Sequence, residues 1–205
     1  MKNIFLANVA RSIALNKKKA HYNNITKLNA PSLWYFTDED KAEDIISILY
    51  RLPAHSGIVL RNYGSKDRKT IIKNVLRIAK RKNFIVLMAS HPRVHGNVNG
   101  LHLPKWEYKC RRNTKEQIIS VSAHSLKDKR KIINTKADII FLSSVFHTNS
   151  HPKRKHLGII RFGLLARSLA RPVIALGGIN NKNIKKLKHF PISGVAAIEA
   201  LKQQK

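Results

Sequence analysis

The last third of the chain alternates short apolar runs with a segment of helical spacing, and this alternation constrains the fold most. Apolar runs lie at Ala137–Phe146, Pro172–Leu176 and Ile192–Ile198, and Leu157–Ala170 carries its apolar residues at helical intervals. Short apolar runs bounded by turn residues are typical of strands that are buried on both faces. The repeated order of strand and helix therefore predicts a parallel sheet with helical crossovers.

Two adjacent glycines, Gly177 and Gly178, follow the second of these runs. Glycine adopts backbone angles closed to other residues and lets another group approach the main chain closely. Asn180 is suited to cap a helix over Asn181–His189. A glycine turn that leads from a strand into a helix N-terminus can hold a phosphate on its backbone N–H groups. For this motif alone, an ordinary tight turn is the alternative interpretation.

Five more units of the same kind precede this region. Strands are predicted at Ser32–Thr37, Gly57–Leu60, Phe84–Met88, Gly100–Leu103 and Ile118–Ala123. Helices are predicted over 41–51, 66–81 and 125–135. Eight strands of one type predict an α/β protein with a single closed (β/α)8 barrel, and 205 residues is near the lower size limit for that fold. An open doubly wound sheet is the alternative, but it would expect a glycine-rich loop after its first strand.

The net charge of +29 would attract anions such as nucleic acid, acidic membranes or phosphorylated ligands. The basic residues are spread along the whole chain, without a nucleic-acid-binding module or a stripe of aromatic residues between them. We therefore expect no specific nucleic-acid partner and interpret the excess as compositional. No apolar run reaches the roughly 18 residues of a transmembrane helix. The single cysteine, Cys110, excludes an internal disulfide framework and favours a cytoplasmic protein.

Residues 1–30 form a basic N-terminal extension with six Lys or Arg and no acid, and the barrel is predicted over 31–205. Ile4–Leu15 can form an amphipathic helix, as in a transit peptide or a surface anchor. The alternative, which we favour, is a helix packed against the bottom of the domain.

In a barrel of this kind the chemistry lies at the carboxyl ends of the strands. Alternation along residues 120–124 (SVSAH) puts Ser122 and His124 on one side, opposite Val121 and Ala123, and we expect the smaller pair to face the interior. His102 lies between two leucines and is also predicted to point inward. The histidines show no HxH or HExxH spacing, so we expect no metal held by histidine.

Read together, the strand ends resemble the thiamine phosphate synthase and thiazole tautomerase family, as a divergent bacterial branch. The resemblance covers nearly all of residues 31–205 and is most specific over 120–179. The similar pieces are Thr37-Asp38, VLR (59–61), GLHL (100–103), VSAHS (121–125), SSVFHTNSHP (143–152), LG (157–158), ALGGI (175–179) and GVAAIEAL (194–201).

The resemblance implies a barrel that joins hydroxymethylpyrimidine diphosphate to thiazole phosphate and releases diphosphate to Mg²⁺. It implies that backbone N–H groups at Gly177, Gly178 and the Ile198-Glu199 turn hold the thiazole phosphate. Glu199 stands where the family usually has serine, and a carboxylate beside a phosphate is repulsive unless it points away or pairs with a cation.

Other site residues follow from the same resemblance. Thr148 and Ser150 match a substrate-contacting loop, Ser122 matches a serine that contacts the diphosphate, and Arg61 matches the first basic residue of a family motif. In a tautomerase-like alternative, which needs no Mg²⁺, His124 would move the proton. A non-catalytic barrel that binds a phosphorylated ligand is the third interpretation. A homodimer stays open.

The expected magnesium ligands are missing from the sequence. The family places aspartates after its third and fourth strands, where this chain has Ser90-His91 and Pro104-Lys105. Among the few acids near the strand ends, Asp38 is the candidate metal ligand. Mg²⁺ is therefore a doubtful cofactor, and Arg61 would take part of its role as a positive charge at the phosphates.

Overall fold

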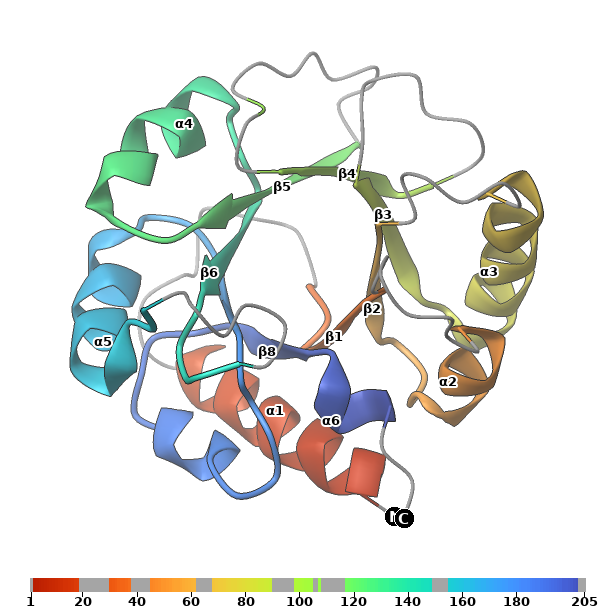
Figure 1. Cartoon of the computed structure of the whole chain (residues 1–205), viewed down its shortest axis with the longest axis horizontal. Helices are drawn as coiled ribbons and strands as arrows, with labels where there is room; N and C mark the ends of the chain where they lie inside the picture. The colour runs from red at the N-terminus through yellow and green to blue at the C-terminus, as the bar shows by residue number, and fades with distance from the viewer. Residues whose placement is uncertain are drawn as a thin grey trace.

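Eight parallel strands close into a barrel in chain order, with β8 paired to β1 (Figure 1). The computed structural model describes residues 2–18, 30–37, 45–61, 68–89, 98–104, 107, 117–148 and 155–202. The strands are β1 Leu33–Phe36, β2 Gly57–Leu60, β3 Ile85–Ala89, β4 Gly100–Leu103, β5 Ile118–Ala123, β6 Ile139–Ser143, β7 Val173–Leu176 and β8 Gly194–Ala197. The predicted single (β/α)8 barrel is confirmed, and the open sheet is excluded.

Helices surround the barrel on its outside (Figure 1). They are α1 Lys2–Lys18, α2 Ile45–Arg51, α3 Arg68–Lys82, α4 Lys129–Asn134, α5 Gly158–Ser168 and α6 Glu199–Lys202, with 3-10 turns η1 Leu126–Asp128 and η2 Ile184–Leu187. No helix in the described ranges is long and apolar enough to cross a membrane.

The segment after β7 differs from its prediction. The Asn180 side-chain oxygen accepts bonds from the N–H groups of Lys182 (2.9 Å) and Asn183 (3.2 Å), but these bonds form a turn, and the cap residue of the following element is Asn183. Only the 3-10 turn η2 forms where a helix over Asn181–His189 was predicted. The Asn183 side chain accepts from the Asn180 N–H and donates to the Gly178 carbonyl. Such local side-chain bonds compete with helical backbone bonds.

The N-terminal helix α1 is packed against the barrel, as favoured, but not at its bottom. It lies in the outer ring, against β8, β1 and η2 (Figure 1). Leu6, Ala10 and Ile13 are buried there. The units after β7 and β8 have only η2 and the short α6, and α1 covers strand surface that these elements leave open. The boundary at residue 30 between an extension and the barrel stays a prediction.

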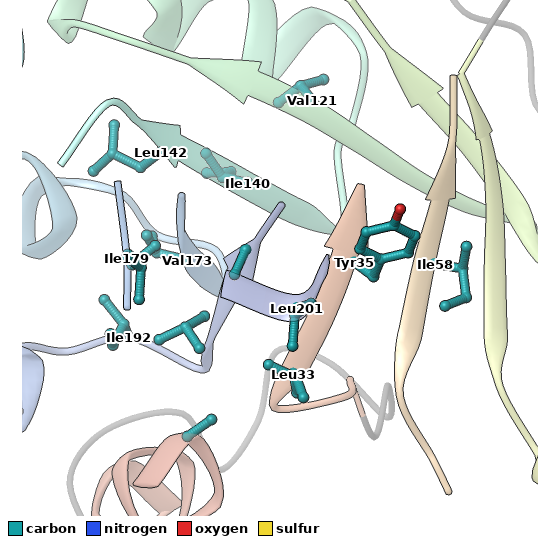
Figure 2. Close-up of a cluster of buried hydrophobic side chains, with 14 of the residues drawn as sticks. Leu33, Tyr35, Ile58, Val121, Ile140, Leu142, Val173, Ile179, Ile192 and Leu201 are labelled. Carbon is teal, nitrogen blue, oxygen red and sulfur yellow. The ribbon is translucent and has the colours of Figure 1, made fainter. Parts of the chain in front are cut away.

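Side chains alternate between two cores. Outward-facing strand residues pack under the helices, and Figure 2 shows part of this layer, with Leu33 and Tyr35 on β1 and Ile58 on β2. Inward-facing residues fill the barrel, where the ring of Phe141 makes edge contacts with the rings of Trp34 (5.2 Å between centroids) and Phe36 (4.8 Å). Side chains therefore fill the barrel interior, and a ligand can bind only at its rim.

Candidate active site

A pocket of about 470 Å³ lies at the carboxyl ends of β6, β7 and β8. Three segments line it: the loop after β6, the glycine turn after β7, and the start of α6 after β8. Of the residues predicted to bind phosphate or substrate, the structure brings together Thr148, Gly177, Gly178, Ile198 and Glu199. Ser150, predicted to belong with them, lies outside the described residues.

The two glycines of this pocket are required by backbone angle and by space. Gly177 has a φ of +100° and Gly178 a φ of +66°, both in the left-handed region. A Cβ atom on Gly177 would lie 2.5 Å from the Ser144 hydroxyl oxygen. One on Gly178 would lie 2.1 Å from the His147 carbonyl oxygen. The loop after β6 therefore packs directly on the main chain of the turn.

Hydrogen bonds hold the turn from both sides through its carbonyl groups. The Phe146 N–H donates to the Gly177 carbonyl (3.1 Å), and the Asn183 side-chain amide donates to the Gly178 carbonyl (2.8 Å). The neighbouring Val145 N–H donates to the Leu176 carbonyl (3.0 Å). These contacts fix the orientation of the peptide planes beside the pocket.

The carboxylate of Glu199, which would repel a phosphate, is paired with a cation. The Lys202 ammonium lies 4.0 Å from it, one turn along α6. Lys182 adds another positive charge to the pocket lining. The local charge balance is therefore compatible with an anionic ligand.

His124 follows β5 and bonds to the end of β6. Its Nδ1 lies 2.8 Å from the Ser143 carbonyl oxygen, which can only accept, so Nδ1 carries the proton in this bond. The carboxylate of Asp128 accepts from the backbone N–H groups of His124 (2.8 Å) and Ser125 (2.9 Å). Sequence reasoning missed Asp128, although the Ser-x-x-Asp spacing of a capping box pointed to it.

Arg61 lies at the end of β2 and is tied to the end of β1. Its backbone N–H donates to the Thr37 hydroxyl (2.8 Å), and its side-chain Nε donates to the Thr37 carbonyl (2.7 Å). Its guanidinium carbon lies 5.6 Å from the centre of the Phe36 ring. In the part of the chain that the structure describes, Arg61, Ser122 and His124 do not line the pocket above β6 to β8.

His102 points into the barrel, as predicted. Its Nδ1 lies 3.0 Å from the Ser120 hydroxyl oxygen and its Nε2 lies 3.1 Å from that of Ser122. The edges and faces of Phe36 and Phe141 enclose the ring, with centroids 5.3 and 5.4 Å away. The contact with His102 shows that Ser122 also faces the interior.

The pKa of His102 is lowered from 6.5 to about 3, first by burial and then by the positive charges of Arg61 and Lys131. In the unfolded chain the ring is protonated below its ordinary pKa of 6.5, whereas in the folded protein it stays neutral down to about pH 3. This difference favours the folded state fully above pH 6.5, and the contribution to the free energy of unfolding is lost as the pH falls toward 3. We expect His102 to lower the free energy of unfolding by about 2 kcal/mol between pH 7 and pH 5.

Urea unfolding of the wild type and of His102→Phe at both pH values measures this effect. Phenylalanine keeps the ring packing and removes the titrating group, so its variant should lose less stability on acidification. Equal losses in the two proteins would contradict the assigned pKa.

The family model for thiamine monophosphate synthase matches residues 38–201. The chain belongs to the thiamine monophosphate synthase family. The resemblance inferred from the strand ends is thereby confirmed, and this membership supports a transferase of thiamine biosynthesis. The site residues taken from the resemblance stay predictions.

Two relatives of this family member match over most of its length. It is 27% identical over 182 residues to the thiamine-phosphate synthase of Clostridium tetani, which covers 83% of this chain and 87% of the relative. It is 28% identical over 181 residues to putative thiamine-phosphate synthase 2 of Aquifex aeolicus, which covers 83% and 97%. The solved thiamine phosphate pyrophosphorylase from Pyrococcus furiosus superposes with a TM-score of 0.70 at 20% identity, over 84% of this chain and 88% of the other. That likeness shows the shared fold.

The end of β4 in this family member does not fit a magnesium ion. The carbonyl of Pro104, directly after the strand, accepts a hydrogen bond from the ammonium group of Lys131, a side chain only 2% exposed. Burial lowers the pKa of Lys131 to about 8, against the opposing effect of Asp128 and Glu107. The group is thus mostly charged at neutral pH, and a positive charge at this rim repels a divalent cation.

No group of three or more His, Cys, Asp or Glu side chains that could hold a metal ion occurs among the described residues. Asp38, the candidate ligand from the sequence, lies outside them.

Proposed function

We propose that this chain is a thiamine-phosphate synthase that joins hydroxymethylpyrimidine diphosphate to thiazole phosphate. The observation that carries this proposal is the pocket above β6 to β8, where Thr148, the glycine turn and the start of α6 surround one hollow. We expect the reaction to take place in the cytoplasm, where a single reduced cysteine is ordinary. A homodimer stays a prediction.

In this proposal the pocket binds the phosphate of the thiazole. Backbone N–H groups of Gly177, Gly178 and the Ile198-Glu199 turn would donate to the phosphate oxygens, and Lys182 would add a positive charge. The hydrogen bonds to the turn's carbonyl groups orient the peptide planes before the ligand arrives. Thr148 also lines the pocket and would donate its hydroxyl group.

The reaction breaks the C–O bond between the pyrimidine methylene and the diphosphate, and both electrons leave with the diphosphate. The lone pair of the thiazole nitrogen then forms a C–N bond to the resulting cation. Arg61 would stabilise the leaving diphosphate, because its bonds to Thr37 hold the guanidinium at the rim. His124 and Ser122 would contact the reacting groups from the end of β5.

Incubation of the purified chain with both precursors tests the proposal. We expect thiamine phosphate to form, and no product at high enzyme concentration would reject synthase activity. A parallel assay for isomerisation of the thiazole carboxylate phosphate, with wild type and His124→Ala, tests the tautomerase alternative. Binding of thiazole phosphate without turnover in either assay would favour the non-catalytic interpretation.

Thr148→Val should raise KM for thiazole phosphate by about tenfold, because it removes one donor while keeping the side-chain volume. Thr70→Val, the same change at an exposed position of α3, is the matched control and should leave KM unchanged. Steady-state kinetics with the pyrimidine substrate held at saturation measures both. Equal KM values in the two variants would remove Thr148 from the proposed site.

A further inference from the structure

A line of hydrogen-bonding groups crosses the barrel interior from β4 to β5. The Ser120 hydroxyl donates to the Leu101 carbonyl (3.2 Å) and also lies 3.0 Å from Nδ1 of His102. Nε2 of the same ring lies 3.1 Å from the Ser122 hydroxyl, which is nearer the carboxyl end of β5. Ser120 and His102 are buried, with 0% and 3% of their surface exposed.

The carbonyl group at the end of this line suggests a direction for each bond. A carbonyl oxygen only accepts, and the Ser120 hydroxyl satisfies both of its contacts when it donates its single proton to Leu101. In that arrangement the bond between Ser120 and His102 is donated by the Nδ1–H of the ring. An uncharged histidine has one ring proton, so its Nε2 accepts, and the Ser122 hydroxyl is the donor.

We propose that His102 is a positioning residue that points the proton of Ser122 into the barrel, so that Ser122 offers only oxygen lone pairs to the ligand. Ser122 would then accept a hydrogen bond from a ligand N–H group and would not donate to a phosphoryl oxygen. An amino group on an aromatic ring, as in an aminopyrimidine, is the donor that fits. The identity of this ligand rests on the proposed synthase function, whereas the direction of the proton does not.

Two features keep this arrangement in place. The rings of Phe36 and Phe141 pack against His102 nearly at right angles, which holds its orientation. Burial and the charges of Arg61 and Lys131 lower the pKa of His102 to about 3. The doubly protonated ring, which would donate at both nitrogens and turn the Ser122 proton outward, therefore does not form near neutral pH.

Long-range proton–nitrogen correlation spectra of histidine-labelled protein test the arrangement directly. We expect His102 to show a protonated Nδ1 and an unprotonated Nε2, unchanged between pH 5 and pH 8, since its pKa is about 3. Ser122→Ala removes the hydrogen-bond partner of Nε2 and should shift its resonance. This shift identifies the His102 signal among those of the other histidines without a substitution at His102 itself. A protonated Nε2 would overturn the proposal.

Binding measurements on the same variants separate positioning from a general structural role. Ser122→Ala should weaken binding of hydroxymethylpyrimidine by about tenfold, while its affinity for inorganic diphosphate changes by less than about twofold. An analogue without the amino group should bind wild type and Ser122→Ala equally. In His102→Phe the freed hydroxyl can turn outward, so diphosphate affinity should be kept or increased and the preference for the amino compound lost.

The opposite pattern, a loss of diphosphate affinity in Ser122→Ala with unchanged pyrimidine affinity, would overturn the acceptor role. Equal weakening of both ligands would show a structural role alone and would equally reject the proposal. The outcome is independent of turnover: a protein that forms no thiamine phosphate, yet shows the expected tautomer and ligand discrimination, would reject only the synthase function.

Discussion

Gly178→Ala is expected to lower the affinity for thiazole phosphate by about tenfold or more. Its new Cβ atom would lie 2.1 Å from the His147 carbonyl oxygen, so the glycine turn or the loop after β6 must move. Both segments line the pocket, and a displacement of either misplaces the backbone N–H groups proposed to hold the phosphate. Calorimetric titration with thiazole phosphate measures the loss.

Gly158→Ala is the matched control for this variant. Gly158 also has a left-handed φ, of +70°, but no atom lies within 4 Å of the position of a new Cβ. The control therefore carries the cost of the backbone angle, about 1 to 2 kcal/mol of stability, without the steric clash. Similar phosphate affinities in the two variants would show that the Gly178 turn does not form the phosphate site.

Phe141→Ala is expected to lower the free energy of unfolding by about 3 to 5 kcal/mol. Phe141 is completely buried inside the barrel, and its ring contacts those of Trp34, Phe36 and His102. Truncation leaves a cavity inside the barrel. The strands cannot move inward to close it, because each is hydrogen-bonded to a neighbour on both sides. Urea unfolding followed by circular dichroism measures the change.

Leu164→Ala on α5 provides the comparison, because this leucine is 63% exposed. Its effect should stay within about 0.5 kcal/mol, as for other surface positions. A loss at Phe141 no larger than the loss at Leu164 would mean that the barrel interior contributes little to stability.

The sequence predicted those features that arise from local pattern. Period-two alternation is enough to put Ser122 and His124 on one face of β5 and His102 on the face opposite its two leucine neighbours, and the pair Gly177-Gly178 is enough to predict a turn that admits a close neighbour. Both features depend on residues adjacent in the chain. The order of the eight strands followed from the repeated units, because parallel strands joined by short crossovers pair with their neighbours.

Contacts between distant residues were not predictable in the same way. The bonds from Arg61 to Thr37 and from Lys131 to Pro104 join residues 24 and 27 positions apart, and they depend on strand register and loop path. Lysine at position 131 reads as a surface residue on a basic helix, yet it is buried. The short η2 turn likewise depends on the side-chain amide of Asn183, which donates to the Gly178 carbonyl. Helix propensities do not predict such a bond.

The position of α1 has a consequence for biosynthesis. Residues 2–18 are made before all eight strands, and β8, one of the strands that they cover, is the last of the eight to be made. The part of the helix that packs on η2 and β8 therefore gains its partners late in translation. Joining the two ends also requires closure of a loop that spans almost the entire polypeptide, which is a slow step by its entropy.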